Sequence, residues 1–220
     1  MNSLQEIAKM IDHSLLQPSL TDEELREGCE VAKQYDVASV CIKPYSVKMA
    51  KELLAGSNVL VGTVIGFPHG NSTIPIKVAE TRQACKDGAV EIDMVVNIGK
   101  VLGEDWRYVK KEIAAVHREC KKHEAILKVI FENDFLPKDK FKIKLCQICS
   151  KVGAEFVKTS TGFIQPGAKV EVVKLLRANL PASIKIKASG GIRDRAFALA
   201  LIEAGADRIG SSQSVKIISE

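Results

Sequence analysis

The chain has 220 residues, of which 46% are hydrophobic and 27% are charged, and its formal net charge is +5. This length and composition are typical of one globular domain with a substantial core, and they exclude a disordered or collagen-like chain. The basic residues are scattered along the chain rather than gathered into an arm. That distribution disfavours nucleic acid as a partner and suits a small anionic substrate.

The first residues do not have the pattern of a targeting segment. Leu4, Ile7, Ala8 and Ile11 are at helical spacing, and no basic lead-in precedes an apolar run, so an N-terminal helix is predicted and a signal peptide is not. No stretch approaches the ~18 apolar residues that a membrane span needs. We therefore expect a cytoplasmic protein with no membrane partner.

Short β-rich runs alternate with longer amphipathic runs from end to end, which favours a parallel sheet covered by helices. The predicted strands are residues 10–13, 38–42, 59–65, 90–95, 126–131, 155–159, 184–189 and 207–210. Helices are predicted over residues 21–35, where Thr21 and Glu24 form a capping box, over residues 104–120, and from near residues 72, 137, 167 and 194.

This alternation predicts an α/β fold, specifically a TIM (β/α)8 barrel with an extra N-terminal helix, formed by residues 1–220 as a single domain. An open doubly wound sheet is the alternative. It is disfavoured because no Gly-rich dinucleotide fingerprint follows a first strand.

A similar helix-to-strand junction occurs three times, at Gly88, Gly153 and Gly205. Each glycine is predicted to end a helix in the left-handed conformation. The residues five positions later are Asp93, Lys158 and Gly210. If the three units are equivalent, these residues lie at similar heights near the C-terminal ends of their strands, where barrel enzymes carry out their chemistry.

Charged residues occupy strand positions that the alternation of side chains turns into the barrel. By this rule Lys158 and Lys187 point inward, and so do Glu91 and Asp93. Burial disfavours a charged lysine and lowers its pKa, and a second lysine nearby lowers it further. A structural ion pair with Asp93 would explain one lysine; two lysines beside one carboxylate favour a catalytic role.

Two further lysines are less informative. Lys128 either faces the interior or lies at a solvated strand end. Lys185 lies two residues before Lys187, which favours an ion pair at the N-terminal face of the barrel.

Glycine-rich turns follow the last two predicted strands, at residues 189–191 and 210–212. Because each turn leads towards a helix, its backbone N–H groups and hydroxyls can converge on an anion. Barrel enzymes often bind phosphate at this place. The alternative, tight turns that need positive φ, explains the glycines but not the serines.

Six cysteines lie mostly within helical or strand-like runs, where a free cysteine acts as a small hydrophobic residue. A zinc site is a minor alternative; its candidate ligands are Cys146, Cys149, His117, Cys120 and His123. We expect no metal site.

Seven segments resemble the deoxyribose-phosphate aldolases over nearly the whole chain. They are residues 11–16, 39–42, 64–70, 91–95, 127–130, 156–162 and 187–193. The runs Val157-Lys-Thr-Ser-Thr-Gly and Lys187-Ala-Ser-Gly-Gly carry the most specific part of this resemblance.

The resemblance implies a class I aldolase that reversibly cleaves 2-deoxy-D-ribose 5-phosphate to D-glyceraldehyde 3-phosphate and acetaldehyde, in deoxyribonucleotide catabolism. It implies Lys158 as the Schiff-base lysine, Lys187 as the ammonium that lowers the pKa of Lys158, and Asp93 as an acid/base group acting through water. Because the iminium withdraws electrons, no cofactor is expected.

The resemblance also implies the positions that bind substrate, a small phosphorylated sugar. These are Asp12, Ser14, Lys128 and Thr161, and in the phosphate loops Gly162, Gly190, Gly191, Gly210 and Ser211. Some relatives place a lysine directly after the glycine at position 162, where this chain has Phe163. A homo-oligomer, a dimer or a tetramer, is expected.

Two alternatives remain at this point. One is a class I aldolase for another phosphorylated aldehyde, which would have the same fold and lysines. The other is a catalytically silent sugar-phosphate-binding barrel, which would not need to retain Lys158.

Overall fold

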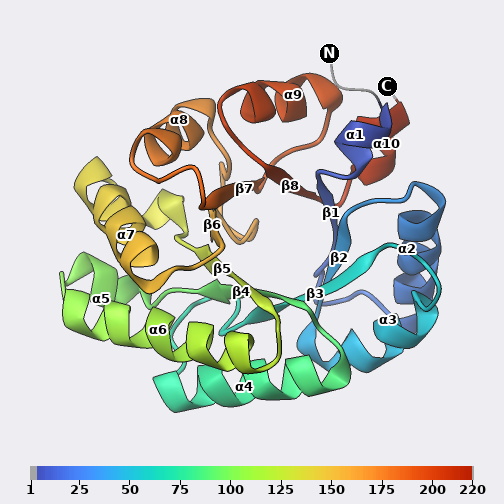
Figure 1. The fold of residues 1–220 in the computed structure, drawn as a ribbon. Helices are drawn as coiled ribbons and strands as arrows, with labels where there is room; N and C mark the ends of the chain where they lie inside the picture. The colour runs from blue at the N-terminus through green and yellow to red at the C-terminus, as the bar shows by residue number, and fades with distance from the viewer. Residues whose placement is uncertain (1–3, 220) are drawn as a thin grey trace.

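The computed structural model describes residues 4–219, and eight parallel strands form a closed barrel at its centre (Figure 1). The strands pair in chain order, and β1 pairs with β8 to close the barrel. Their bounds are β1 Ile11–Leu15, β2 Ser39–Ile42, β3 Leu60–Ile65, β4 Glu91–Val95, β5 Ile126–Ile130, β6 Phe156–Lys158, β7 Lys185–Ser189 and β8 Arg208–Ser211. The predicted TIM barrel is confirmed, and the open sheet is wrong.

Helices surround the barrel (Figure 1). Those that were predicted are α1 Leu4–Ala8, α2 Asp22–Gln34, α4 Ile74–Asp87, α6 Trp106–Lys122, α7 Asp139–Val152, α8 Val170–Ala178 and α9 Arg195–Glu203. Three short helices were not predicted: α3 Val47–Leu53, α5 Ile98–Leu102 and α10 Ser214–Ser219. Two 3-10 turns, η1 Pro44–Ser46 and η2 Asn133–Phe135, complete the connections.

Local sequence signals account for the ends of these helices. The predicted capping box of Thr21 and Glu24 opens α2, so the first N–H groups of that helix have partners. Gly88, Gly153 and Gly205 have φ values of 112°, 83° and 111°, the left-handed conformation predicted for them. Each glycine therefore reverses the chain from a helix into the next strand.

The hydrophobic core lies between the strands and the helices, and the barrel interior is largely polar. On β4, Ile92 and Met94 are fully buried in the core, whereas Glu91 and Asp93 point into the barrel and meet other charged side chains. The same alternation on β7 places Ile186 in the core and Lys187 inside the barrel. The interior of this barrel is therefore a network of charges rather than an apolar core.

The cysteines behave as the sequence predicts. All six are free, and five are buried. Within residues 4–219, no three His, Cys, Asp or Glu side chains are grouped so that they could hold a metal ion, and the zinc alternative has no support. None of the helices in the same range has the length and apolar character needed to span a bilayer.

Candidate active site

Two lysines and one carboxylate meet inside the barrel. Lys158 on β6 and Lys187 on β7 are register partners, and each Nζ donates a hydrogen bond to Asp93 Oδ2 over 2.8 Å. The three side chains are at most 2% exposed. The structure thus brings together Asp93, Lys158 and Lys187, but the prediction of similar heights is wrong for Asp93, which is in register with Phe156, two residues before Lys158.

Asp12 on β1 extends this cluster. Its Oδ2 lies 2.5 Å from Lys187 Nζ and 2.9 Å from Lys128 Nζ. Its Oδ1 lies 2.5 Å from Arg208 Nη1 and accepts a hydrogen bond from the Ser39 hydroxyl over 2.7 Å. Both carboxylate oxygens are therefore fixed, and one is aimed at Lys187.

Lys128 and Glu91 complete the network on the side away from the strand C-termini. Lys128 Nζ lies 2.5 Å from Glu91 Oε2 and 3.2 Å from Asp93 Oδ1. Glu91 Oε1 lies 3.2 Å from Arg208 Nη2. Lys128 therefore points into the barrel, and the solvated strand end considered for it is wrong.

The network unites four cations with three carboxylates. The cations are Lys128, Lys158, Lys187 and Arg208, and the carboxylates are Asp12, Glu91 and Asp93. Four positive charges minus three negative ones leave one positive charge when every group is ionised. Such an excess favours release of one proton from the network.

The electrostatic effects at this site have opposing causes. Burial raises the pKa of Asp93, but the ammonium groups of Lys128, Lys158 and Lys187 outweigh it and hold that pKa well below its usual range. Burial lowers the pKa of Lys187, but Asp12 and Asp93 outweigh it and raise that pKa above its usual value. Contrary to the effect expected for paired lysines, Lys187 is therefore held as a permanent ammonium.

Lys158 has the fewest partners among these cations. Among residues 4–219, Lys158 forms one ion pair, with Asp93, whereas Lys187 contacts two carboxylates and Lys128 three. Loss of a proton from Lys158 therefore removes one ion pair, whereas loss of a proton from Lys187 or Lys128 removes two or three. The geometry thus makes Lys158 the best candidate for a nucleophile.

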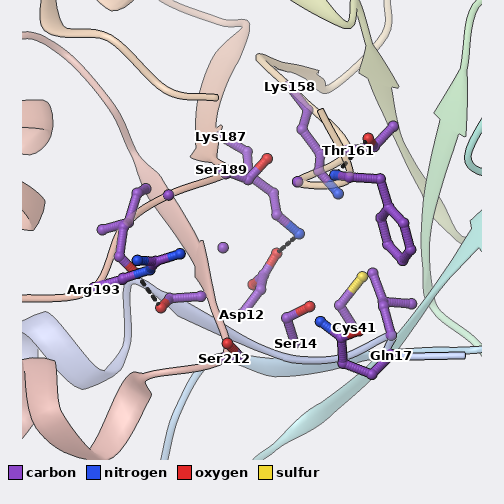
Figure 2. A pocket seen from close by; sticks show the side chains of 18 of the residues that line it. Asp12, Ser14, Gln17, Cys41, Lys158, Thr161, Lys187, Ser189, Arg193 and Ser212 are labelled. Carbon is purple, nitrogen blue, oxygen red and sulfur yellow. Dashed lines mark hydrogen bonds and ion pairs between the residues drawn. The ribbon is translucent and has the colours of Figure 1, made fainter. Parts of the chain in front are cut away.

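A cavity of about 170 Å³ opens above this network (Figure 2). It is lined by ten of the residues predicted for the site: Asp12, Ser14, Lys158, Thr161, Gly162, Lys187, Gly190, Gly191, Gly210 and Ser211. Figure 2 shows the ammonium groups of Lys158 and Lys187 projecting towards a common space. The cavity therefore combines a candidate nucleophile with the predicted anion loops.

Two predicted residues are not in the cavity lining. Asp93 and Lys128 lie beneath it, because their strand positions place them closer to the N-terminal face than Lys158 and Lys187. Lys128, which is expected to bind substrate, contacts three carboxylates of the interior network with its ammonium. Its role toward substrate stays a prediction.

Sequence reasoning missed several residues of the lining, among them Gln17, Cys41 and Arg193. Arg193 lies on the side of the cavity that Ser212 also borders (Figure 2). Arg193 lies two residues after Gly191, so its place in the motif could have indicated it. Gln17 lies in a loop without any such signal.

The loop after β6, which carries Gly162 and Gly167, packs closely against the glycine-rich turn at residues 189–191. A Cβ on Gly167 would lie 2.6 Å from the carbonyl carbon of Gly190, and Ala168 N–H donates a hydrogen bond to Gly190 O over 3.0 Å. Gly190 and Gly191 have φ values of 92° and 74°. Residues 192–194 then lead from this turn into α9, which begins at Arg195 with Asp194 as its N-cap, as the sequence predicts.

Gly210 is required for a different reason, since its φ is not positive. A Cβ at this position would lie 2.9 Å from Lys187 Cε and 2.9 Å from Ser189 Cβ. The missing side chain lets the lysine stem pass across β8 towards Asp12.

Thr161 is anchored beneath its loop. Its hydroxyl and its N–H both donate hydrogen bonds to the buried Glu132 carboxylate. Burial raises the pKa of Glu132 above its usual value. The hydroxyl of Thr161 is thus used to hold the loop that carries Gly162.

Phe163 forms part of the apolar wall of the cavity. Its ring packs edge-on against Phe67, with 5.3 Å between the ring centroids. Phe163 therefore forms an aromatic contact between two loops. Lys185, the other lysine considered, is exposed, and its Nζ lies 5.8 Å from the Phe156 ring centroid rather than in the expected ion pair.

A closed parallel barrel with buried lysines facing a cavity at the C-terminal ends of the strands defines a barrel enzyme. The family model described as DeoC/LacD family aldolase matches residues 6–213. The chain belongs to this family of aldolases.

Individual relatives agree with this assignment. The chain is 52% identical to a deoxyribose-phosphate aldolase of Caldanaerobacter subterraneus subsp. tengcongensis over 99% of its own length and 94% of the relative's. It is 47% identical to that of Clostridium tetani, over 98% and 99%. Among solved structures, the tetrameric deoxyribose phosphate aldolase of Aeropyrum pernix has a TM-score of 0.93 and 32% identity, covering 100% of this chain and 92% of that one.

Proposed function

We propose that this aldolase reversibly cleaves 2-deoxy-D-ribose 5-phosphate to D-glyceraldehyde 3-phosphate and acetaldehyde through a Schiff base on Lys158. The observation that carries the mechanism is the position of Lys158 in the cavity with one carboxylate contact, beside an ammonium that stays charged. The substrate is supported by the names of the relatives.

The covalent steps follow from the chemistry of an amine and an aldehyde. Neutral Lys158 attacks the aldehyde carbon, water leaves, and an iminium forms. A base removes the proton of the hydroxyl on the third carbon, and the bond between the second and third carbons breaks. Its electrons pass to the iminium, which gives an enamine and releases glyceraldehyde 3-phosphate.

The enamine then takes a proton on carbon, and water releases acetaldehyde and Lys158. Since Asp93 lies beneath the cavity, we infer that protons reach it through one water molecule or through the lysine ammonium groups that it contacts. Asp12 lines the cavity with its oxygens fixed, which suits a residue that orients the substrate hydroxyls.

The phosphate is proposed to lie opposite the nucleophile, among the glycine-rich loops. Gly162, Gly190, Gly191 and Ser211 line that part of the cavity, and Arg193 adds a positive charge there. Backbone N–H groups and hydroxyls at such a place stabilise a phosphate dianion.

Four further properties are proposed with this function. The iminium itself withdraws electrons, so the proposed reaction uses no cofactor, and residues 1–220 act as one catalytic domain. Free cysteines throughout support a cytoplasmic location. The tetramer described for the Aeropyrum pernix relative supports a homo-oligomer.

The test is borohydride reduction in the presence of acetaldehyde, followed by peptide mass mapping. A two-carbon adduct on Lys158 is expected, together with cleavage of 2-deoxyribose 5-phosphate in an assay for acetaldehyde release. Lys158→Arg should lose both. Lys185→Arg, at an exposed lysine, should retain both. If the adduct forms on another residue, or if no adduct forms, the proposed mechanism is wrong. If the protein cleaves only a different phosphorylated aldol, the proposed substrate is wrong.

A further inference from the structure

We propose that Arg208 and Glu91 are positioning residues that set the charge of the barrel interior and so the pH at which Lys158 becomes a nucleophile. The proposed mechanism assigns no step to either residue. The inference rests on the proposed function, since it concerns Schiff-base formation by Lys158.

Arg208 and Glu91 lie on the side of the network away from substrate. Arg208 precedes Gly210 by two residues on β8, and Glu91 precedes Asp93 by two residues on β4. Neither lines the cavity, and their side chains are 14% and 2% exposed. They act on the reaction only through other residues.

Their contacts connect them to both halves of the site. Arg208 binds Asp12 Oδ1 over 2.5 Å, which leaves Asp12 Oδ2 for Lys187. Glu91 binds Lys128 over 2.5 Å, and Lys128 in turn contacts Asp93. Arg208 and Glu91 also form an ion pair with each other over 3.2 Å. The two residues are therefore the layer of the network that lies farthest from the cavity.

Most of the titratable groups around Lys158 come from the barrel strands. They are Asp12 on β1, Cys41 on β2, Glu91 and Asp93 on β4, Lys128 on β5, Lys187 on β7 and Arg208 on β8, and Glu132 follows β5. Burial raises the pKa of the Cys41 thiol, which keeps it neutral. Burial also raises the pKa of Glu132, which is held by Thr161 at the edge of the cluster.

The sign of each contribution follows from the net charge. With Lys158 protonated the network carries one positive charge, and loss of its proton makes the network neutral. Without Arg208, the same step would turn a neutral network into a negative one, so Lys158 would hold its proton more firmly. Without the charge of Glu91, the step would relieve a double positive charge, so the proton would leave more easily.

The size of the two effects should be similar. β4 and β8 are each two strands away from β6, on opposite sides, a distance of about 10 Å at the usual strand spacing. At the effective dielectric constant that applies to such sites, a unit charge at that distance shifts a titration by roughly one pH unit.

The experiment measures the rate of borohydride-trapped adduct formation with acetaldehyde between pH 5 and pH 10, an interval of about five pH units around neutrality. Arg208→Met should raise the midpoint of the pH profile by about one unit, and Glu91→Gln should lower it by about one unit. Arg208→Lys should keep the midpoint of the unmodified protein, since it keeps the charge. Lys185→Met is the matched control and should leave the midpoint unchanged, because Lys185 is an exposed cation on β7 outside the network.

The outcomes separate this inference from the proposed function. If the unmodified protein forms no adduct on Lys158, the proposed function is wrong. If it does form the adduct, equal midpoints in Arg208→Met and Glu91→Gln, or shifts of the same sign, overturn the inference. Circular dichroism and thermal melting report folding; should Arg208→Met not fold, the isosteric Glu91→Gln and the charge-keeping Arg208→Lys decide the question.

Discussion

Asp93 accepts a hydrogen bond from Lys158 over 2.8 Å, although Asp93 itself lies outside the lining of the cavity. The carboxylate thus contacts the nucleophile from below while substrate would approach from above. A carboxylate in this position could have two distinct roles in an aldolase. One is to hold the ammonium groups in place, and the other is to receive the proton that moves during bond cleavage.

Asp93→Asn tests whether these two roles are distinct. The substitution removes a negative charge, which makes loss of the Lys158 proton easier, so the trapped two-carbon adduct should still form. Turnover should fall by roughly 10²–10⁴-fold, because the proton acceptor is gone. Adduct yield by mass spectrometry and kcat by acetaldehyde release are the two measurements. If adduct yield and kcat fell by the same factor, the two roles of Asp93 would not be distinct.

Lys187→Leu should keep the fold and nearly abolish adduct formation at neutral pH. The ammonium of Lys187 contacts Asp12 and Asp93, and its removal leaves their negative charge to hold the proton on Lys158. Adduct formation should recover at higher pH. Lys187→Arg, which keeps the charge, should retain measurable adduct formation at pH 7, and unchanged trapping in Lys187→Leu would refute this role.

Gly210→Ala should lower activity by about 10-fold or more, since a misplaced reacting group is costly. The new methyl group would lie 2.9 Å from the Lys187 stem and from Ser189 Cβ, so Lys187 must move away from Asp12. Gly99→Ala is the control, because its nearest neighbour outside the helix would be 3.6 Å away. The measurements are kcat for both variants and a thermal melt that confirms folding.

Thr161→Val should weaken binding of the phosphorylated substrate. The substitution removes the hydroxyl that donates a hydrogen bond to Glu132. The buried carboxyl group of Glu132 then has one donor fewer, at a cost of about 1–3 kcal/mol. We expect KM to rise roughly 10-fold with a smaller effect on kcat, since the loop that carries Gly162 is loosened. Thr161→Ser keeps the hydroxyl and should remain close to the unmodified protein.

Glu155→Gln should destabilise the protein at pH 7 and have little effect near pH 2. Burial raises the pKa of Glu155, but hydrogen bonds from His117, the Leu127 N–H and Lys121 outweigh it and lower that pKa to about 2. A lowered pKa contributes stability above the unfolded value near 4.5, and this contribution is lost as pH falls through about 2.

For a partly exposed group, the loss at pH 7 should be about 1–2 kcal/mol. Urea unfolding of Glu155→Gln and of the unmodified protein at several pH values measures it. A difference that stays constant from pH 7 to pH 2 would show that the charge of Glu155 is not its cause.

The sequence predicts the barrel because each strand alternates in a regular way and each long helix has a clear apolar face. It does not predict α3, α5 or α10, since helices of five to seven residues give too few turns for a periodic signal. β1 extends to Leu15, two residues beyond its predicted end. Ser14 therefore lies within the strand.

The same alternation places Lys158, Lys187 and Asp93 in the interior, but it does not reveal which charged groups touch. The contact of Asp12 with Arg208 joins residues 196 positions apart, and only the closed barrel creates it. Arg208 itself could have been predicted to face inward, since Ile209 faces the helices. The three carboxylate partners of Lys128 come from other strands, so the alternation along its own strand could not reveal them.

The ion pair of Asp12 and Arg208 joins the first strand of the barrel to the last. During synthesis on the ribosome, Lys158 and Lys187 therefore emerge well before the strand that completes their surroundings. Until β8 docks beside β1, Asp12 lacks its arginine and the interior lacks the fourth cation. A chain shortened before residue 208 would retain both lysines but lack Arg208, so the proposed charge excess in the interior depends on the last strand.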